Sequence, residues 1–387
     1  MSTGATRPWT WEGLAAATLR RQFPRIRGRG EVAVVELVRR VGPIQSQAAR
    51  APFLCVASRL PGASYDTMTA PHESMEVVRS TSLRGTVHTS TREHHAALNA
   101  VATRALATLW RRTLKLDQRR LDEFRAEIEA LSEAQWVTHD EIEAHMRSWF
   151  ARHALHDSLT ATENQAGRFA YRAHAAMLRR PRAAAAGWDG QAEAVYRAAR
   201  HAIGEQQLDP QDALNLLVRH HLAAAGPVTR RDIAWWSGEG LRQVDAAVDA
   251  LADEIVVRPG PNGLDYLDLV QAPVRSGDTD PGVRLLPEYD ALLLAYDPAA
   301  RDRFADREAV SYSSNRANGV HAPTVLVDGR LRGKWRLTRS GDSAVIEVET
   351  FPGERLLDPG ELADQAGAVG AVLALSVTDV RVTRLAT

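Results

Sequence analysis

The sequence is poor in three features, and each shortage narrows what the protein can do. There is one cysteine in 387 residues, Cys55, which excludes an internal disulfide and a cysteine-based zinc site. Only Lys115 and Lys334 among the 48 basic residues are lysines, so few amines could form a Schiff base with a substrate. No run approaches the roughly 18 consecutive apolar residues of a membrane span, and residues 1–13 lack the apolar core of a signal peptide. We therefore expect a cytoplasmic protein with no membrane partner.

The overall composition is that of an ordinary globular protein, with 44% apolar and 25% charged residues and a net charge of zero. A neutral total does not favour nucleic-acid binding, which would have to come from local clusters of charge. The densest basic cluster spans residues 20–29, where five arginines fall within ten residues. Arg25 and Arg27 in this loop could contact phosphates, and a solvated loop is an equal alternative.

The first part of the chain has the pattern of a winged helix. Residues 31–41 show helical spacing of apolar side chains, and Gly42-Pro43 ends that helix. Residues 44–47 read as a short extended piece, after which Pro52 suits the first turn of another helix. Residues 82–90 look like a strand bent at a glycine. Helix, extended piece, helix and strand are the order expected of this motif.

Two further winged-helix units follow. Thr138–Glu141 resembles a capping box that opens a helix, and the wing of this unit is expected near residues 179–190. The third unit is the clearest, with three helices from residue 211 to 251 and a hairpin that turns at 259–263. Its last helix carries five acidic residues against Arg242, which is a poor fit to a DNA groove.

The C-terminal part changes to short strands, which predict a small β-barrel. Within it, four basic residues alternate with other side chains and so share one face of a strand. They are Arg330, Arg332, Lys334 and Arg336. These cations could follow a DNA backbone, or they could pair across strands with Glu347 and Glu349. The residues alone do not choose between the two.

The sequence therefore predicts an α+β fold of three tandem winged-helix motifs followed by a small C-terminal β-barrel. The length allows two to four compact units. We place four units at residues 1–130, 131–208, 209–275 and 282–387.

Familiar catalytic motifs are missing. The 13 histidines show no HExxH spacing, and there is no dinucleotide-binding, Walker or nucleophile-elbow motif, so we expect no metal and no cofactor. Gln45 and Gln47 remain, because i, i+2 spacing puts both amides on one side of an extended segment. Two amides could hold one water molecule between them. Glutamine is neither an acid nor a base, so a structural role is the ordinary explanation. As chemistry, the pair suits only a leaving group that is already activated.

Five segments in order resemble the AlkZ/YcaQ-type bacterial DNA glycosylases. They are residues 41–62, 82–95, 216–238, 285–297 and 322–336. The resemblance implies three tandem winged-helix motifs and a β-barrel around a basic DNA channel. It also implies excision of alkylated purines, typically N7-alkylguanine, in resistance to crosslinking or bulky alkylating agents. The family's glutamine-apolar-glutamine motif falls on Gln45 and Gln47, and Ser46 departs from it because that position is usually apolar.

The chemistry implied by this resemblance is modest. N7 alkylation puts a positive charge on guanine, so the base leaves as a neutral species without a general acid. The enzyme has to orient water and stabilise an oxocarbenium-like sugar. We expect a monofunctional glycosylase that acts as a monomer on double-stranded DNA with alkylated bases. Arg84 and His88 could face the same channel as DNA contacts, and a role on the strand surface is an equal alternative.

Two other classes of protein would use the same modules. A non-catalytic DNA-binding or drug-sequestering resistance protein would bind alkylated DNA without releasing a free base. A sequence-specific repressor would prefer one operator and would usually dimerise, and the acidic third helix counts against it.

Overall fold

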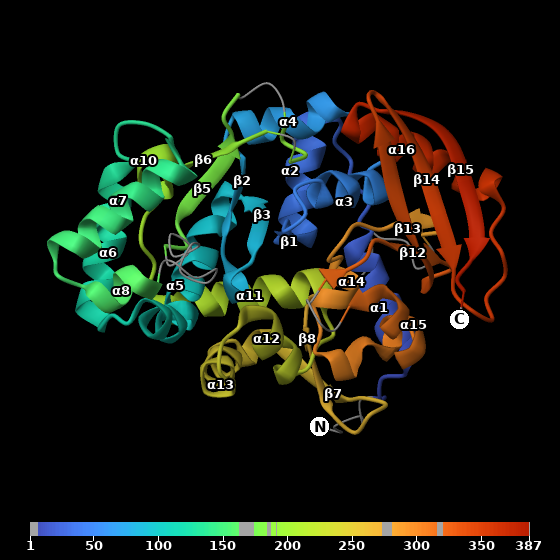
Figure 1. The fold of residues 1–387 in the computed structure, drawn as a ribbon. Coiled ribbons are helices and arrows are strands. Elements are labelled where there is room, and N and C mark those ends of the chain that lie inside the picture. The colour runs from blue at the N-terminus through green and yellow to red at the C-terminus, as the bar shows by residue number, and fades with distance from the viewer. Residues whose placement is uncertain are drawn as a thin grey trace, which may run out of the picture.

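The computed structural model shows a mixed fold of helices and short sheets (Figure 1). It describes residues 7–161, 174–183, 187–190, 192–272, 281–315 and 320–386. In Figure 1, one lobe carries α5 to α8 with β5 and β6, and the C-terminal sheet lies on the opposite side. β1 and β3 lie between them, and α11 runs beneath. None of the helices in the described parts is long and apolar enough to cross a membrane.

The first predicted unit contains most of the elements that the sequence indicates. They are α1 (Trp11–Gln22), α2 (Gly30–Val41), β1 (Ile44–Gln45), α3 (Ala51–Arg59), α4 (Tyr65–Glu73), β2 (Val77–Thr81), η1 (Leu83–Gly85), β3 (Val87–Thr91), α5 (Arg92–Leu114) and α6 (Gln118–Leu131). Gly42 ends α2, and Pro52 lies in the first turn of α3, as predicted. One prediction was wrong, because residues 82–90 are not a single bent strand. β2 and β3 form an antiparallel hairpin around η1, since a tight turn reverses the chain there.

One six-stranded sheet joins the strands of the first two predicted units. The second unit contributes β4 (Val137–Thr138), α7 (His139–Arg152), α8 (His156–Ala161), β5 (Met177–Pro181), β6 (Ala194–Ala198) and α10 (Ala199–Ile203). The strand order is β1-β3-β2-β5-β6-β4, with Ser80 opposite Leu178 where the two halves meet. The expected wing at 179–190 corresponds to the end of β5 and the loop after it, of which residues 184–186 lie outside the described part.

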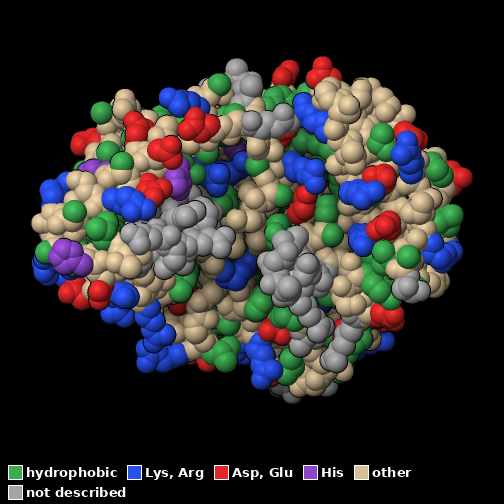
Figure 2. Space-filling model, in the orientation of Figure 1, with side chains coloured by type: hydrophobic (Ala, Val, Ile, Leu, Met, Phe, Trp, Pro, Cys, Tyr) green, Lys and Arg blue, Asp and Glu red, His purple; other side chains and the backbone are tan. Residues whose placement is uncertain are grey.

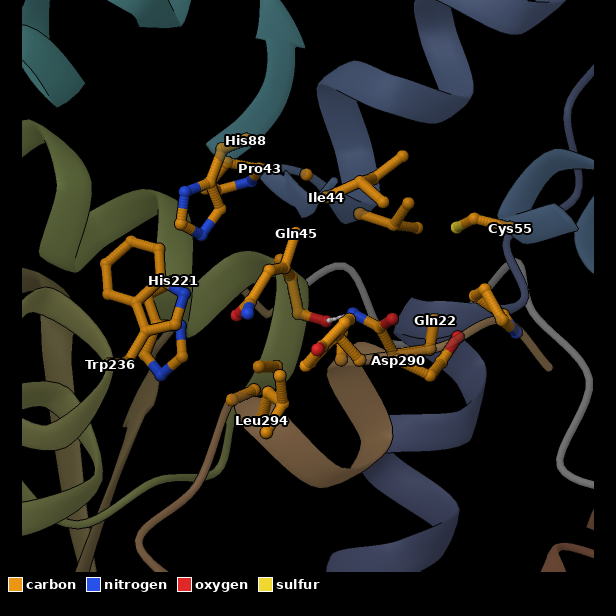
Figure 3. A pocket seen from close by; sticks show the side chains of 18 of the residues that line it. Gln22, Pro43, Ile44, Gln45, Cys55, His88, His221, Trp236, Asp290 and Leu294 are labelled. Carbon is orange, nitrogen blue, oxygen red and sulfur yellow. Dashed lines mark hydrogen bonds between the residues drawn. The ribbon is translucent and has the colours of Figure 1, made fainter. Parts of the chain in front are cut away.

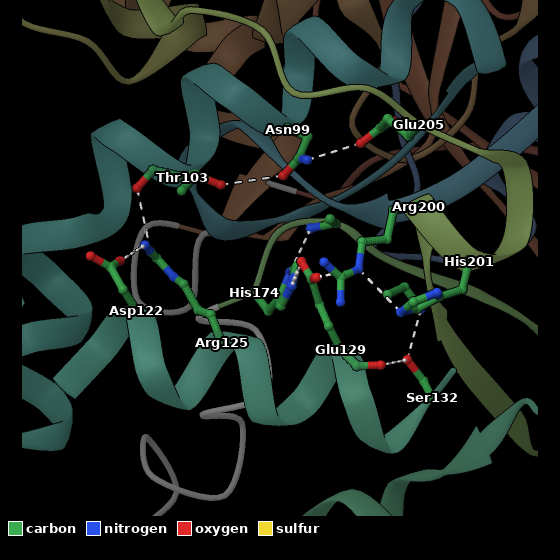
Figure 4. A network of polar contacts seen from close by, with 12 residues as sticks. Asn99, Thr103, Asp122, Arg125, Glu129, Ser132, His174, Arg200, His201 and Glu205 are labelled. Atoms are coloured by element: carbon green, nitrogen blue, oxygen red, sulfur yellow. Dashed lines mark hydrogen bonds and ion pairs between the residues drawn. The ribbon is translucent and has the colours of Figure 1, made fainter. Parts of the chain in front are cut away.

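Polar contacts fix this sheet to the helices beside it (Figure 4). Glu129 on α6 accepts from His174 Nε2 and pairs with Arg200, each at 2.6 Å. His95 on α5 joins Ser80 Oγ at 2.9 Å to the carboxylate of Glu205. This serine-histidine-glutamate order resembles a nucleophilic triad, but Ser80 is buried and does not line the cavity that β1 and β3 border. The contacts hold the lobe together.

The third predicted unit follows the expected order of elements. It has α11 (Pro210–Ala225), α12 (Arg230–Ser237), α13 (Leu241–Ala250), η3 (Ala252–Glu254) and the antiparallel pair β7 (Ile255–Pro259) and β8 (Asp265–Leu269). Thr229 and Asp232 form a capping box that begins α12. Acidic residues around α13 are partly neutralised, since Arg230 pairs with Asp245 at 3.0 Å. That all three units are winged helices stays a prediction. The boundary predicted between the third unit and the C-terminal part, near residues 275–282, falls mostly outside the described residues.

The C-terminal part differs from the predicted barrel. Its elements are β9 (Arg284–Leu285), α14 (Ala291–Leu294), η4 (Pro298–Arg303), α15 (Arg307–Ser313), β10 (Ser314–Asn315), β11 (Val320–His321), β12 (Thr324–Val327), β13 (Arg330–Ser340), β14 (Ser343–Thr350), η5 (Pro359–Leu362), α16 (Ala363–Leu373) and β15 (Ser376–Arg384). Among the described residues, β15-β14-β13-β12-β9 form an open sheet and no closed barrel is found. The two outer strands do not pair, and α16 packs between β15 and α3.

A loop of the second unit ties the lobes together. Trp188 is buried in the same apolar cluster as α2, α3 and the C-terminal sheet, and its ring stacks on His72 with centroids 4.8 Å apart. Asp189 lies 3.6 Å from Arg339 on β13. Arg79 on β2 donates to Trp188 O at 3.1 Å and to Ala49 O at 2.8 Å. Arg79 therefore links this loop to the segment after β1.

Candidate active site

A small cavity lies where β1, η1, β3, α11, α12 and the segment before α14 meet (Figure 3). Its wall includes Gln45, Arg84, His88, His221, Trp236 and Asp290. The cavity measures about 30 Å³, which is room for roughly one or two water molecules. The space beside Gln45 is therefore of the size that a positioned water needs.

The glutamine segment is an edge strand held against β3. Ile44 lies opposite Thr89 and Gln45 opposite His88, and Ser46 N donates to Val87 O at 2.7 Å. The turn before β1 is held from α11, where His220 Nε2 donates to Gly42 O at 2.6 Å. Short pairing on one side and a helix on the other fix where the glutamines point.

Burial alternates along this segment. Gln45 is half-buried and lines the cavity, Ser46 is buried, and Gln47 is exposed outside the cavity wall. Val87 N donates to Gln47 Oε1 at 3.3 Å, which restrains the second amide beside the strand. The predicted catalytic pair thus lies close to one cavity, with only Gln45 reaching into it.

Ser46 occupies a position that accommodates a hydroxyl. Its Oγ donates to Ile44 O and lies within hydrogen-bond distance of Thr89 Oγ1, each at 2.8 Å. A buried hydroxyl with partners carries little penalty, whereas one without them would be destabilising. The departure from the apolar residue usual at this position is therefore compensated locally by Thr89.

Replacing Ser46 with alanine should weaken the strand and leave the wall of the cavity unchanged, since Ser46 does not line it. We expect a loss of about 1–2 kcal/mol in the free energy of unfolding, because one buried hydrogen-bond network disappears and Thr89 loses a partner. Urea unfolding measures this loss. A variant that unfolds at the same urea concentration as the wild type would contradict a stabilising role of this buried hydroxyl.

Arg84 connects Gln45 to α12. Its Nη2 donates to Gln45 Oε1 at 3.0 Å, and its Nη1 donates to the carbonyl of Trp236. The backbone of Arg84 is left-handed, with φ 56°, a conformation that non-glycine residues adopt only where their surroundings hold it. Among the described residues no carboxylate pairs with this guanidinium. Burial and the neighbouring Arg301 lower the pKa of Arg84 to about 10, so it stays a cation at neutral pH.

Two buried histidines, His88 and His221, also line the cavity. Burial, with a smaller contribution from the cationic Arg84, lowers the pKa of His88 to about 3. Burial likewise lowers the pKa of His221 to about 3, and its ring stacks on Trp236 with centroids 4.2 Å apart. Both imidazoles are neutral at pH 7, so they act as hydrogen-bond groups and add no positive charge.

The far end of the cavity is a buried ion pair. Arg59 Nη2 donates to Asp290 Oδ1 at 2.9 Å, and the two side chains are 0% and 2% exposed. Cys55 lies beside them, and burial raises the pKa of its thiol to about 11, which makes it a poor nucleophile. Among the described residues no group of three His, Cys, Asp or Glu side chains is placed to hold a metal ion.

The predicted DNA contacts fall in three places, which are the cavity wall, a groove along α2, and strand β13. Arg84 and His88 join Gln45 in the cavity wall. Arg25 and Arg27 instead border a separate groove of about 880 Å³ along α2, which Arg39 and Arg40 also line. Figure 2 shows further Lys and Arg side chains beside the hollow in the middle of the face it presents.

Three of the four cations that the sequence predicted on β13 pair with acids, two of them on the neighbouring strand β14 and one in the turn after it. Arg332 pairs with Glu354, Lys334 lies 3.1 Å from Glu349, and Arg336 lies 2.7 Å from Glu347. The last two are the cross-strand pairs that the alternation allowed as the alternative to DNA contact. Arg330, at the start of the strand, is half-buried. A role of the four in DNA binding stays a prediction.

Comparison with known proteins identifies the family. The sequence profile described as DNA glycosylase AlkZ-like matches residues 38–373. The chain belongs to the AlkZ-like DNA glycosylase family. Among solved structures it is similar to the Streptomyces sahachiroi DNA glycosylase AlkZ, with a TM-score of 0.77 and 19% sequence identity. The match covers 97% of this chain and 100% of that one, and at this identity it shows a shared fold. No curated protein sequence matches the chain.

Membership of the AlkZ-like family implies that the chain binds DNA. The sequence did not single out His221 and Trp236 as parts of the site. A signal was available, since His221 lies among the buried apolar positions of its helix, and a histidine on an apolar face needs a partner. Their approach to Gln45 depends on contacts between segments about 180 residues apart, as between His220 and Gly42 (178 residues), which spacing alone does not reveal.

Proposed function

We propose that this AlkZ-like protein hydrolyses the N-glycosidic bond of alkylated purines in double-stranded DNA and leaves an abasic site. N7-alkylguanine is the substrate class, which includes bulky natural-product adducts and interstrand crosslinks. The observation that carries the proposal is Gln45, fixed by Arg84 at a cavity that has room for water. Family membership supports the same reaction.

The geometry suits a reaction in which the leaving group is already activated. With Oε1 of Gln45 engaged by Arg84, the Nε2 group is left to donate to a water in the cavity. Such a donor orients the nucleophile but does not activate it strongly. An N7-alkylated base needs little more, because its positive charge is neutralised when the glycosidic bond breaks. Positioning and electrostatics can then carry the rate enhancement.

The small cavity favours a mechanism in which the base is not swung into the protein. Glycosylases that flip a base hold it in a fitted pocket. The space beside Gln45 holds roughly one or two water molecules, which is too little for a purine ring system. We therefore propose that the water reaches C1′ of a nucleotide that stays in the duplex. A bulky adduct then needs no pocket of its own.

The test is release of free base. We expect the wild-type protein, incubated with duplex DNA containing one N7-methylguanine, to release that base and to leave a site that hot alkali cleaves. Mass spectrometry of the supernatant identifies the released base. Duplex DNA with unmodified guanine is the control, and bulky N7 adducts and crosslinks test the finer substrates. Tight binding of alkylated DNA without release would instead establish a sequestering protein.

A further inference from the structure

Water attack on C1′ releases a proton, and the two glutamines are poorly placed to accept it. Gln45 Oε1 already accepts from Arg84, and Gln47 Oε1 already accepts from Val87 N. Each oxygen keeps a second lone pair, but an amide oxygen is a far weaker base than an imidazole nitrogen. The site therefore calls for another acceptor close to Gln45.

His88 meets this requirement by position. It lies directly opposite Gln45 in the pairing of β3 with β1, and side chains so paired stand about 5 Å apart on the same face. Both side chains line the cavity, and Figure 3 shows them projecting into it from the two strands.

The tautomer of His88 is set by the turn beneath it. Nδ1 lies 3.1 Å from Thr86 O and 3.1 Å from Ser82 Oγ. A carbonyl oxygen can only accept, so the ring proton resides on Nδ1 and Nε2 carries a lone pair. Among the described residues Nε2 has no hydrogen-bond partner, and it is absent from the sealed polar atoms of the interior. It is the acceptor that the cavity exposes.

The other basic groups in the wall are occupied or sealed. Nε2 of His221 is buried, and the imidazole ring stacks on Trp236. Asp290 Oδ1 accepts from Arg59 and from Leu292 N, and its Oδ2 is buried. Within the part of the chain that the structure describes, His88 is the basic group of this wall that stays available.

We propose that Nε2 of His88 accepts the proton of the attacking water. The inference rests on the proposed function and adds a second catalytic residue to it. The water oxygen forms a bond to C1′ as the bond from C1′ to N9 breaks. The electron pair of the C1′–N9 bond stays on N9 and neutralises the cationic purine. The proton passes from the new C1′ oxygen to His88 and from there to solvent. Gln45 orients the water, and Arg84 positions Gln45.

The electrostatics around His88 are consistent with this role. Arg84 on η1 lowers its basicity together with burial, Arg301 on η4 acts on Arg84, and His221 on α11 is neutral. With a pKa of about 3, His88 is unprotonated throughout the physiological range. A weak base suffices here, because a water bonded to C1′ is a far stronger acid than an imidazolium. The excision rate should therefore stay level from pH 8 down to about pH 5.

A matched pair of variants separates the two nitrogens of the ring. An asparagine amide falls near Nδ1 and can still donate to Thr86 O, but it leaves nothing at Nε2. A glutamine amide reaches the place of Nε2 and offers a hydrogen-bond acceptor there, but it is a far weaker base than imidazole. We expect His88→Asn and His88→Gln both to lower the single-turnover rate on N7-methylguanine DNA about 100-fold, whereas recovery in His88→Gln would show that Nε2 only positions the water. The Kd for DNA should change little in either variant.

The outcomes are distinct. Equal rates in His88→Asn and the wild type, or a loss in both variants that appears only as weaker DNA binding, would overturn the proposal and leave His88 as a DNA contact. A wild-type excision rate that decreases as the pH is lowered from 8 to 5 would also overturn the proposal. Thermal melts of both variants report on folding. If the wild type itself releases no base, the proposed function fails rather than this inference.

Discussion

A protein carrying both Gln45→Ala and Gln47→Ala is expected to bind alkylated DNA and to release its base roughly 100-fold more slowly than the wild type, or slower still. Gln45 loses the amide that faces the cavity, and Arg84 loses the acceptor for its Nη2. The water then has no fixed position relative to C1′, and misplacement of a reacting group by about 1 Å is enough for an effect of this size. Single-turnover release of N7-methylguanine measures it.

The single variants divide the effect between the two residues. Gln45→Ala should account for most of the loss, because Gln45 lines the cavity and Gln47 is exposed outside it. Gln118→Ala, which alters an exposed glutamine on α6, is the matched control and should leave the rate unchanged. If the double variant excises as fast as this control, the glutamines are not catalytic and the proposed mechanism is wrong.

Local sequence signals predicted the elements well where they depend on neighbouring residues. Thr10 caps α1 by accepting from Gly13 N, and Thr138 and Glu141 form the capping box that begins α7. Gly238 ends α12 with a left-handed backbone at φ 78°. Caps, breakers and apolar spacing act within a few residues, so a single sequence carries them.

Longer-range features were missed for a physical reason. The hairpin of β2 and β3 has buried residues on both faces, so it lacks the alternation that marks a half-exposed strand. The open C-terminal sheet depends on α16, whose apolar run follows no strand pattern and whose packing partner α3 lies about 300 residues away. Pairing of β2 with β5, which unites two predicted units, left no local trace.

The sequence predicted the two glutamines as the candidate site, and their catalytic role stays a prediction; the other residues of the cavity wall could not be predicted from spacing. Spacing put Gln45 and Gln47 on one side of a strand, and the burial of Ser46 between them agrees with this. Arg84 was expected near the site, but its bond to Gln45 follows from a left-handed turn that no residue type demands. The alternation of basic residues on β13 was compatible with DNA contact and with cross-strand ion pairs. Only the register with β14 showed Lys334 opposite Glu349.

Arg59→Met is expected to destabilise the protein by about 3–5 kcal/mol, a large part of the total stability of an ordinary domain. Arg59 and Asp290 are 231 residues apart in sequence and are both buried at the end of the cavity. Without the guanidinium, Asp290 is left as a buried carboxylate with no counter-charge at Oδ1, and no described residue forms a hydrogen bond with its Oδ2. The variant also loses the bond from Arg59 to Gln22 O. Urea unfolding measures the change.

A substitution at Asp290 shows whether the loss of stability in Arg59→Met comes from the unpaired charge or from lost packing. Adding Asp290→Asn to Arg59→Met removes the stranded charge and keeps a side-chain oxygen for Leu292 N, so the double variant should be more stable than Arg59→Met alone. Arg39→Met, which breaks an exposed pair with Glu36, is the matched control and should change stability by less than about 1 kcal/mol. If Arg59→Met unfolds at the same urea concentration as this control, the ion pair does not hold the wall of the cavity. If the variants follow the expected order of stability, the ion pair stabilises the wall behind Gln45. Rate losses in the Gln45 and His88 variants then report on catalysis and not on folding.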